Sequence, residues 1–351
     1  IEKVVEKSLK KESVVDEVAA LLKFKHILFP ELVGKAAELN KELFDKMIEF
    51  YAVSYVADLC VNDCSYCGHS SDMEQERDLL VGNEQRLDFL EVLKYGPPDL
   101  CILAGEHHFI DADYLARAAN RAIEVDHGSL QRITFNVAPM SVEDFGKIRQ
   151  QVDFPLQFRI FQESYDHETY KQHHHRGPKA NFDFRLGAQE RALQAGFDNV
   201  GIGSLMGLNN DHSEYTNSGN DYEILALVAH AYHLQEQYGA IPYSLSIPRL
   251  QKVEGSCFEI PNAVDDLTYV VYHAILKLAL PETKLIVTCR ETPEMRDILR
   301  PLIGIEDFAV KPGVGGNYRE THFQNILGDT RTTPELVNDV REKGYETVVE
   351  I

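Results

Sequence analysis

The sequence has no long apolar run and relatively few basic residues, and both deficits exclude classes of function. No apolar stretch approaches the ~20 residues needed to span a bilayer, and no signal peptide is visible at the beginning. We therefore expect a cytoplasmic protein with no membrane partner. Asp and Glu (56) outnumber Lys and Arg (35), which gives a net charge of −21. Because binding to a phosphate backbone needs a basic surface, we also expect no nucleic-acid partner.

Cysteine is scarce, and its distribution is uneven. Six cysteines occur in 351 residues, and three of them lie within eight positions. This pattern does not make a disulfide framework, whereas it fits a reducing compartment and a cofactor. The length suits two average domains or one α/β barrel.

The cysteine cluster is the strongest chemical signal in the chain. Cys60, Cys64 and Cys67 follow the apolar run Tyr51–Ala57 in the spacing C-x3-C-x2-C. A closed structural zinc site normally takes four protein ligands, so three thiolates on one loop favour an iron–sulfur cluster. A [4Fe–4S] cluster held by three thiolates leaves one iron open to a small molecule. The alternatives are a zinc half-site completed by His69 and a chance grouping.

Apolar runs and helical periodicity alternate after the first 50 residues, which indicates a parallel sheet. The expected strands are Tyr51–Ala57, Leu100–Gly105, Arg132–Ala138, Pro155–Phe161, Asn199–Met206, Tyr243–Ile247, Lys284–Cys289 and Phe308–Lys311. The expected helices between them are Gln85–Leu93, Ala112–Val125, Val142–Val152, Phe182–Ala195, Tyr222–Tyr238, Asp265–Leu280 and Glu294–Leu302. Eight such strands predict a closed (β/α)8 barrel, a TIM-like α/β fold, with an open doubly wound sheet as the alternative.

Helical patterns also flank the expected barrel. Val14–Phe24 and Leu32–Phe50 predict an N-terminal helical extension over residues 1–50, and Thr333–Lys343 predicts a C-terminal helix. The barrel is expected over 51–320, and a C-terminal segment packed on it over 321–351. Chemistry in such barrels collects at the C-terminal ends of the strands.

Residues around the cysteines resemble the radical S-adenosylmethionine (SAM) enzymes. Tyr66 precedes the last cysteine and Gly68 follows it, and the second expected strand ends in Gly105-Glu106. We expect Gly105 to let the backbone approach a ligand closely. The resemblance implies a [4Fe–4S] cluster on the three cysteines, with SAM bound nearby. It assigns Glu106 to the methionyl amine of SAM and Tyr66 to the cofactor side of the site.

Further runs resemble the aromatic-amino-acid lyase branch of that superfamily. They are Gln162-Glu163-Ser164-Tyr165, Gly177-Pro178-Lys179, Asp183-x-Arg185-Leu186, Ser246-x-Pro248-Arg249 and Arg290-Glu291. The branch includes 2-iminoacetate synthase, which is the tyrosine lyase of thiamine biosynthesis, the tyrosine lyase of hydrogenase maturation and the tryptophan lyase of nosiheptide biosynthesis. The resemblance implies that Arg185 lies near the SAM carboxylate and that Gln162 and Glu163 lie near its ribose or methionine moiety.

Three residues are expected to contact the substrate. Arg290 has the planar fork that grips a carboxylate with two hydrogen bonds, so we assign it to the substrate carboxylate. The resemblance places Tyr55 and Ser246 beside it, although a core tyrosine is an alternative for Tyr55. Arg249 is either a substrate-side cation or a loop anchor. The adjacent His173, His174 and His175 point in different directions on a helix, so we expect them to be exposed or to support the site rather than share a metal.

The resemblance implies that the chain cleaves the Cα–Cβ bond of L-tyrosine to 2-iminoacetate (dehydroglycine) and p-cresol through a 5′-deoxyadenosyl radical. It also implies a flavodoxin- or ferredoxin-like electron donor and a thiazole-forming partner protein. The sequence departs from the branch at His69, where tyrosine lyases usually carry Phe, and at Cys289, which replaces Thr. The region Asp307–Tyr318 lacks the serines that position the substrate in the relatives. The alternatives are a lyase or mutase for tryptophan or another amino acid, and a non-enzymatic metal-binding scaffold.

Overall fold

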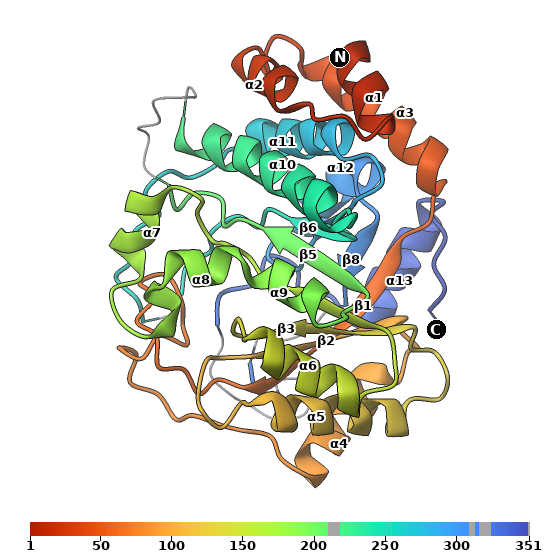
Figure 1. Ribbon diagram of the computed structural model, residues 1–351. Helices are drawn as coiled ribbons and strands as arrows, with labels where there is room; N and C mark the ends of the chain where they lie inside the picture. Colours follow the sequence, from red (N-terminus) through yellow and green to blue (C-terminus); the bar gives the residue numbers. More distant parts are fainter. Residues whose placement is uncertain (210–217, 254, 309–312, 316–323, 350–351) are drawn as a thin grey trace.

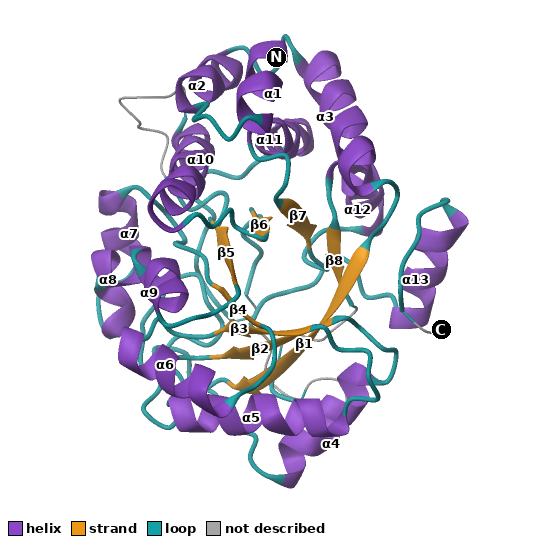
Figure 2. Ribbon diagram, turned by 45° about the vertical axis from the view of Figure 1, so that its right-hand side comes forward, coloured by secondary structure: helices purple, strands orange, loops and turns teal. Residues whose placement is uncertain are grey.

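The strands form one closed parallel barrel in the order β1 to β8. The computed structural model describes residues 1–209, 218–253, 255–308, 313–315 and 324–349. Figure 2 shows the barrel strands enclosed by the helices. The strands are β1 (Glu49–Ala57), β2 (Asp99–Ala104), β3 (Arg132–Asn136), β4 (Leu156–Arg159), β5 (Asn199–Gly203), β6 (Ser244–Ser246), β7 (Lys284–Val287) and β8 (Ile305–Asp307). The expected (β/α)8 barrel is thereby confirmed.

Several strands end earlier than their apolar runs. The fifth was expected to reach Met206, but β5 ends at Gly203, and beyond it the chain makes only isolated bridges, Glu163 with Ser204 and Met206 with Arg249. The last strand was expected at Phe308–Lys311, yet β8 lies at Ile305–Asp307, and residues 309–312 lie outside the described part of the chain. These early ends place polar side chains in loops at one end of the barrel.

The helices follow the expected alternation. They are α1 (Glu2–Leu9), α2 (Val15–Lys23), α3 (Phe29–Phe44), α4 (Asn83–Leu93), α5 (Ala112–Val125), α6 (Val142–Gln151), α7 (His167–His173), α8 (Phe182–Leu186), α9 (Ala188–Gln194), α10 (Gly219–Tyr238), α11 (Asp266–Ala279), α12 (Pro293–Leu299) and α13 (Thr333–Glu342). Two 3-10 turns are η1 (Pro178–Ala180) and η2 (Arg300–Leu302). Side chains that accept a backbone N–H fix several helix starts, namely Asp111, Ser141, Asp265, Thr292 and Thr332.

Two helix expectations were wrong. The helix expected over Phe182–Ala195 is divided at Gly187, which ends α8 and begins α9. The helix expected to reach Phe50 ends at Phe44, because Asp45 has a positive φ of 53° and the chain then enters β1. The sequence reading also missed α1 and α7.

The N-terminal helices cover one side of the barrel. Figure 1 shows α1, α2 and α3 beside α10 and α11, and α3 and α11 are in close contact.

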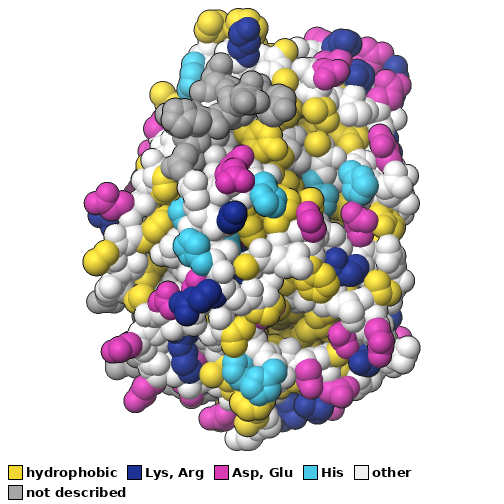
Figure 3. Space-filling model, turned by 60° about the vertical axis from the view of Figure 1, so that its left-hand side comes forward, with side chains coloured by type: hydrophobic (Ala, Val, Ile, Leu, Met, Phe, Trp, Pro, Cys, Tyr) yellow, Lys and Arg dark blue, Asp and Glu magenta, His cyan; other side chains and the backbone are white. Residues whose placement is uncertain are grey.

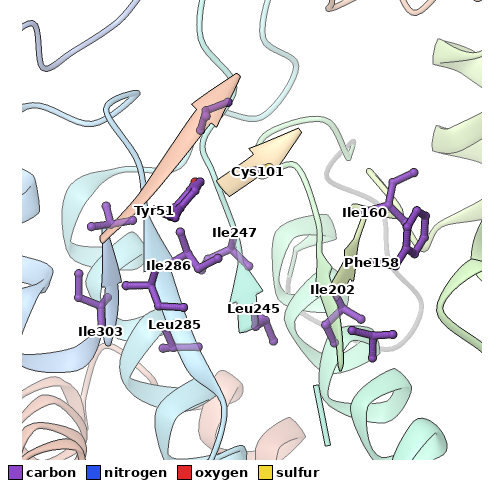
Figure 4. Packing of buried hydrophobic residues seen from close by; sticks show 14 of the residues in the cluster. Tyr51, Cys101, Phe158, Ile160, Ile202, Leu245, Ile247, Leu285, Ile286 and Ile303 are labelled. Carbon is purple, nitrogen blue, oxygen red and sulfur yellow. The ribbon is translucent and has the colours of Figure 1, made fainter. Parts of the chain in front are cut away.

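Figure 4 shows part of the apolar cluster, with Tyr51 and Cys101 among aliphatic residues such as Ile286 and Leu245. The division of the chain at residues 50 and 320 stays a prediction.

The described surface agrees with an acidic protein. Acidic and basic side chains are interspersed on the face in Figure 3, and the described part of that face shows no continuous basic strip. None of the described helices is long and apolar enough to cross a membrane.

Candidate active site

A large cavity opens at the C-terminal ends of the strands. Its empty space is about 1540 Å³, which includes space open to solvent. The expected site residues that line it are Cys60, Cys64, Cys67, Tyr66, Glu106, Glu163, Arg185, Tyr55, Ser246 and Arg290. The fold therefore gathers ten of the eleven expected side chains around one space.

The cysteine loop is shaped by hydrogen bonds within the protein. Arg77 donates to four backbone carbonyls, at Asp58 (2.9 Å), His69 (3.0 Å), Ser70 (2.6 Å) and Met73 (3.2 Å). One guanidinium thus closes the loop on itself, since its five donors lie in a fixed fork. The sequence reading did not single out Arg77.

The sulfur atoms also receive N–H groups. The backbone N–H of His69 donates to Cys67 Sγ at 3.4 Å, and Gln324 Nε2 lies 3.7 Å from the same sulfur. Asn62 Nδ2 lies 3.6 Å from Cys60 Sγ. Donors of this kind stabilise thiolates and tune a bound cluster.

Two of the three adjacent histidines support this loop. His173 Nδ1 pairs with Ser65 Oγ at 2.8 Å, and His174 Nε2 pairs with the Tyr66 hydroxyl at 2.7 Å. His173 and His174 are buried, whereas His175 is exposed. The expectation that these histidines are either exposed or support the site agrees with the positions of all three.

Asn62 joins the cysteine loop to the end of β2. Its Nδ2 donates to Glu106 Oε2 at 2.7 Å, and its Oδ1 accepts the backbone N–H of Lys179 at 3.0 Å. A Cβ at Gly105 would lie 2.3 Å from the Leu59 carbonyl oxygen. Gly105 is thus required for packing against the cysteine loop, and it also lines the cavity, so its expected close approach to a ligand stays a prediction.

A buried ion cluster forms the wall next to this loop. Glu163 Oε1 accepts from Lys179 Nζ at 2.7 Å and from Arg185 at 3.1 Å. Burial alone would raise the pKa of Glu163, but the two cations outweigh it and hold that pKa below its ordinary value. Two cations share one carboxylate here, so this wall can accept an anionic group of a ligand.

Gln162 is the expected site residue that does not line the cavity. It is buried, whereas its neighbours Phe161 and Glu163 both line the cavity. Its Nε2 has no hydrogen-bond partner among the described residues. The position predicted for Gln162 beside SAM is therefore not supported by the geometry.

The expected substrate residues lie together on other strands. Arg290 follows β7, and its guanidinium makes no hydrogen bond or ion pair with a described residue. The Ser246 hydroxyl is buried without a partner in the described part of the chain. Tyr55 donates to Gln324 Oε1 at 3.4 Å. Burial raises the pKa of Tyr55 and the nearby Arg290 partly offsets it, so Tyr55 stays a neutral donor.

Arg249 is a loop anchor. It forms a two-point ion pair with the buried Glu291 and also binds Asp266 at 2.6 Å and the Val264 carbonyl at 3.1 Å. It does not line the large cavity. Of the two roles left open for Arg249, the geometry favours the structural one.

Polar residues that the sequence reading missed lie deeper in the cavity. Arg159, the last residue of β4, is 2% exposed, and its guanidinium carbon lies 4.4 Å from the centre of the Tyr51 ring. Asp307, the last residue of β8, accepts the Cys289 N–H at 2.8 Å. Burial raises the pKa of Asp307 to about 6, although Arg296 lowers it. Cys101 also lines this part of the cavity. We call Arg159, Tyr51 and Asp307 the cavity floor.

The cysteine donors fit an iron–sulfur cluster better than one zinc ion. Among the described residues, no group of three or more His, Cys, Asp or Glu side chains is arranged to hold a single metal ion. The zinc half-site completed by His69 is therefore not formed in the described part of the chain. All three sulfurs nevertheless line the same cavity. Burial raises the pKa of Cys64 to about 12, and a coordinating metal would instead keep such a thiol deprotonated. A cluster with a separate iron for each thiolate matches this arrangement.

Comparison with known proteins agrees with this chemistry. A family model described as the biotin and thiamin synthesis associated domain matches residues 246–346. The 2-iminoacetate synthase of Escherichia coli (strain K12) is 29% identical over 294 residues, which cover 83% of this chain and 74% of that protein. The crystal structure of HydG, a maturase of the [FeFe]-hydrogenase, is 30% identical and superposes with a TM-score of 0.89, covering 98% of this chain and 75% of HydG. The chain belongs to the radical SAM aromatic-amino-acid lyase family.

Membership fixes the class of chemistry. The chain is a radical SAM lyase, and its cofactors are a [4Fe–4S] cluster and SAM. Methylornithine synthase (PylB) superposes with a TM-score of 0.76 over 98% of this chain, but at 18% identity it shows the shared fold alone.

Proposed function

We propose that this radical SAM lyase cleaves the Cα–Cβ bond of L-tyrosine to give 2-iminoacetate and p-cresol. One observation carries the proposal. The cavity that holds the three cysteines and Glu106 also holds the Arg290 guanidinium and the Ser246 hydroxyl, neither of which has a side-chain partner among the described residues. Unpaired polar groups of this kind in a largely buried site indicate a polar ligand.

Cys60, Cys64 and Cys67 would hold the cluster, and Glu106 would accept a hydrogen bond from the SAM ammonium group. With both groups bound, one-electron reduction supplies a 5′-deoxyadenosyl radical. Arg185 and Lys179 would face the SAM carboxylate, since they share the single carboxylate of Glu163. We propose that Tyr66 contributes to the cofactor wall, where its hydroxyl is fixed by His174.

The remaining residues would position the amino acid. Arg290 binds the substrate carboxylate with two hydrogen bonds, while Tyr55 and Ser246 supply hydroxyl groups close to it. The substrate is thereby held in one orientation, which is the main contribution a protein can make to a radical reaction. The barrel walls around the cavity exclude water from the reactive species.

Two partners belong to the same proposal. A flavodoxin- or ferredoxin-like protein would deliver two electrons per turnover, one for the cleavage of SAM and one that, with a proton, completes p-cresol. A thiazole-forming protein would consume 2-iminoacetate. Anaerobic turnover with either donor in place of dithionite tests the first, and formation of a thiazole product in a coupled assay tests the second.

The reaction is tested with the reconstituted protein, SAM, dithionite and L-tyrosine. We expect p-cresol and 5′-deoxyadenosine in equal amounts. SAM cleavage without p-cresol rejects tyrosine but keeps the class of chemistry, and a panel that includes tryptophan then tests the alternative substrates. Protein that binds zinc and no iron would overturn the proposal as a whole.

Substitution of Arg290 tests the assigned orientation. Arg290→Met should raise the KM for tyrosine by about 100-fold, because a charge-assisted pair to the carboxylate is lost. Arg117→Met, at an exposed position on α5, is the matched control and should leave the KM unchanged. An unchanged KM in Arg290→Met would assign the substrate carboxylate to another residue.

A further inference from the structure

The cavity floor contains two opposite charges, Arg159 and Asp307, that form no ion pair with each other, and Asp307 is instead paired with Arg296 at 3.4 Å. Arg159 is 2% exposed, and it forms no ion pair with a described residue. Asp307 is 5% exposed and lines the same cavity. Both interact electrostatically with Tyr51 and Cys101, so both lie near the same point of the floor. The buried Asp99 attracts Arg159 but is itself paired with Arg132 at 3.1 Å, so Arg159 has no ion-pair partner of its own among the described residues, although a buried charge is costly to desolvate.

Arg159 keeps an unused donor in this position. Its Nη1 has no hydrogen-bond partner among the described residues. The guanidinium stacks on the Tyr51 ring at 4.4 Å, which fixes its plane but uses none of its N–H groups. Asp307 Oδ1 accepts one backbone N–H from Cys289 and lies 3.4 Å from Arg296 Nη2, and a carboxylate has about four acceptor positions. The floor therefore offers one donor and one acceptor.

We propose that Arg159 and Asp307 form a subsite for the hydroxyl group of a phenolic side chain, with Arg159 donating to the phenol oxygen and Asp307 accepting the phenol proton. This inference rests on the proposed function and names the group that selects its substrate. A phenol is the aromatic side chain that satisfies both residues at once. Phenylalanine leaves both unpaired, the indole N–H of tryptophan leaves Arg159 unpaired, and an acidic side chain is repelled by Asp307.

The position of the floor along the barrel suits this role. Tyr51 and Tyr55 both line the cavity from β1, and four residues of a strand span about 13 Å. Tyr55 lies beside Arg290, which is assigned to the substrate carboxylate, whereas Tyr51 lies beside Arg159. An aromatic amino acid held by its carboxylate at Arg290 would thus direct its ring toward the floor.

Selectivity between tyrosine and phenylalanine tests the subsite during turnover. A site built to bind a hydroxyl group rejects the analogue without it by about 10⁴-fold or more. In the holoenzyme, kcat/KM measured from 5′-deoxyadenosine formation should favour tyrosine by this factor. Arg159→Met, which keeps the length of the side chain but removes its donors, should reduce the ratio to about 10. Arg117→Met should keep the wild-type ratio.

A binding experiment separates this inference from the proposed function. Calorimetry on the holoenzyme with SAM should give at least tenfold tighter binding of p-cresol than of toluene, and Arg159→Met should abolish the difference. That result without any tyrosine cleavage supports the subsite and rejects the proposed reaction. Equal binding of p-cresol and toluene by the wild-type enzyme overturns the subsite, and so does a preference that persists in Arg159→Met. If that variant does not fold, Asp307→Asn, which turns one acceptor oxygen into a donor, should still reduce the preference, and an unchanged preference there overturns the subsite.

Discussion

Removal of the Asn62 side chain should weaken SAM binding, although Asn62 itself is not assigned to any group of SAM. Asn62 is 2% exposed, and its amide nitrogen donates to Glu106 Oε2 at 2.7 Å. A hydrogen bond to a charged group contributes about 1.5–3 kcal/mol. If Asn62→Ala releases Glu106 from its binding position, that loss appears in the affinity for SAM. Because about 1.4 kcal/mol corresponds to tenfold in affinity, we expect the Kd for SAM to rise by about 10- to 100-fold.

The experiment requires that cofactor loading and folding be measured separately. Iron and sulfide per chain, urea unfolding and anaerobic calorimetry with SAM should be compared for the wild type, Asn62→Ala and Asn62→Asp. Asn62→Asp keeps the shape but directs a carboxylate at Glu106, so it should bind SAM no better than Asn62→Ala. Asn120→Ala, which removes a surface hydrogen bond to Gln151, is the matched control. Full iron loading and a Kd within twofold of the wild type in Asn62→Ala would refute the reasoning.

Three further predictions concern buried charges. Burial lowers the pKa values of His230 and His273 to about 4. Below pH ~6.5 the unfolded chain therefore binds protons that the native chain does not, and the wild type loses stability as the pH falls. Between pH 7 and pH 5, the free energy of unfolding of His273→Gln in urea should fall by about 2 kcal/mol less than that of the wild type. Burial lowers the pKa of Lys277 to about 7, so the unfolded chain again binds more protons, and from pH 7 to 9 the wild type should gain about 2 kcal/mol relative to Lys277→Met. Arg249→Gln leaves the buried Glu291 without its counter-ion and should cost about 3 kcal/mol of stability with an unchanged KM for the amino acid; a raised KM would instead place Arg249 at the substrate.

The barrel could be predicted from the sequence because its signal is repeated. Each strand buries a short apolar run, and each intervening helix shows the helical spacing of apolar residues. Errors at single boundaries therefore do not change the predicted fold. The predicted ends of the strands were wrong where pairing with a distant segment decides whether the strand continues. Met206 continues an apolar run, but its partner is Arg249 in an isolated bridge rather than a neighbour in the ladder. Nothing local to Met206 distinguishes these outcomes.

The site was predictable where the chemistry is local and where a resemblance supplied the rest. The cysteine spacing is contained in eight residues, whereas Asn62 acts through Glu106 and Lys179, which are distant in sequence. Arg159 was missed for another reason. It lies in a mostly apolar strand, and the sequence alone does not show that its side chain is buried in the cavity. The closed barrel is needed to place it there.

The four carbonyl groups held by Arg77 bear on the order in which the enzyme matures. One side chain holds four carbonyl groups of the loop, so part of the loop's conformation is fixed by the polypeptide rather than by iron and sulfide. Zinc fingers differ in this respect, because they are unfolded without their metal. Assembly of the cluster would then complete a loop whose outer frame the polypeptide already provides.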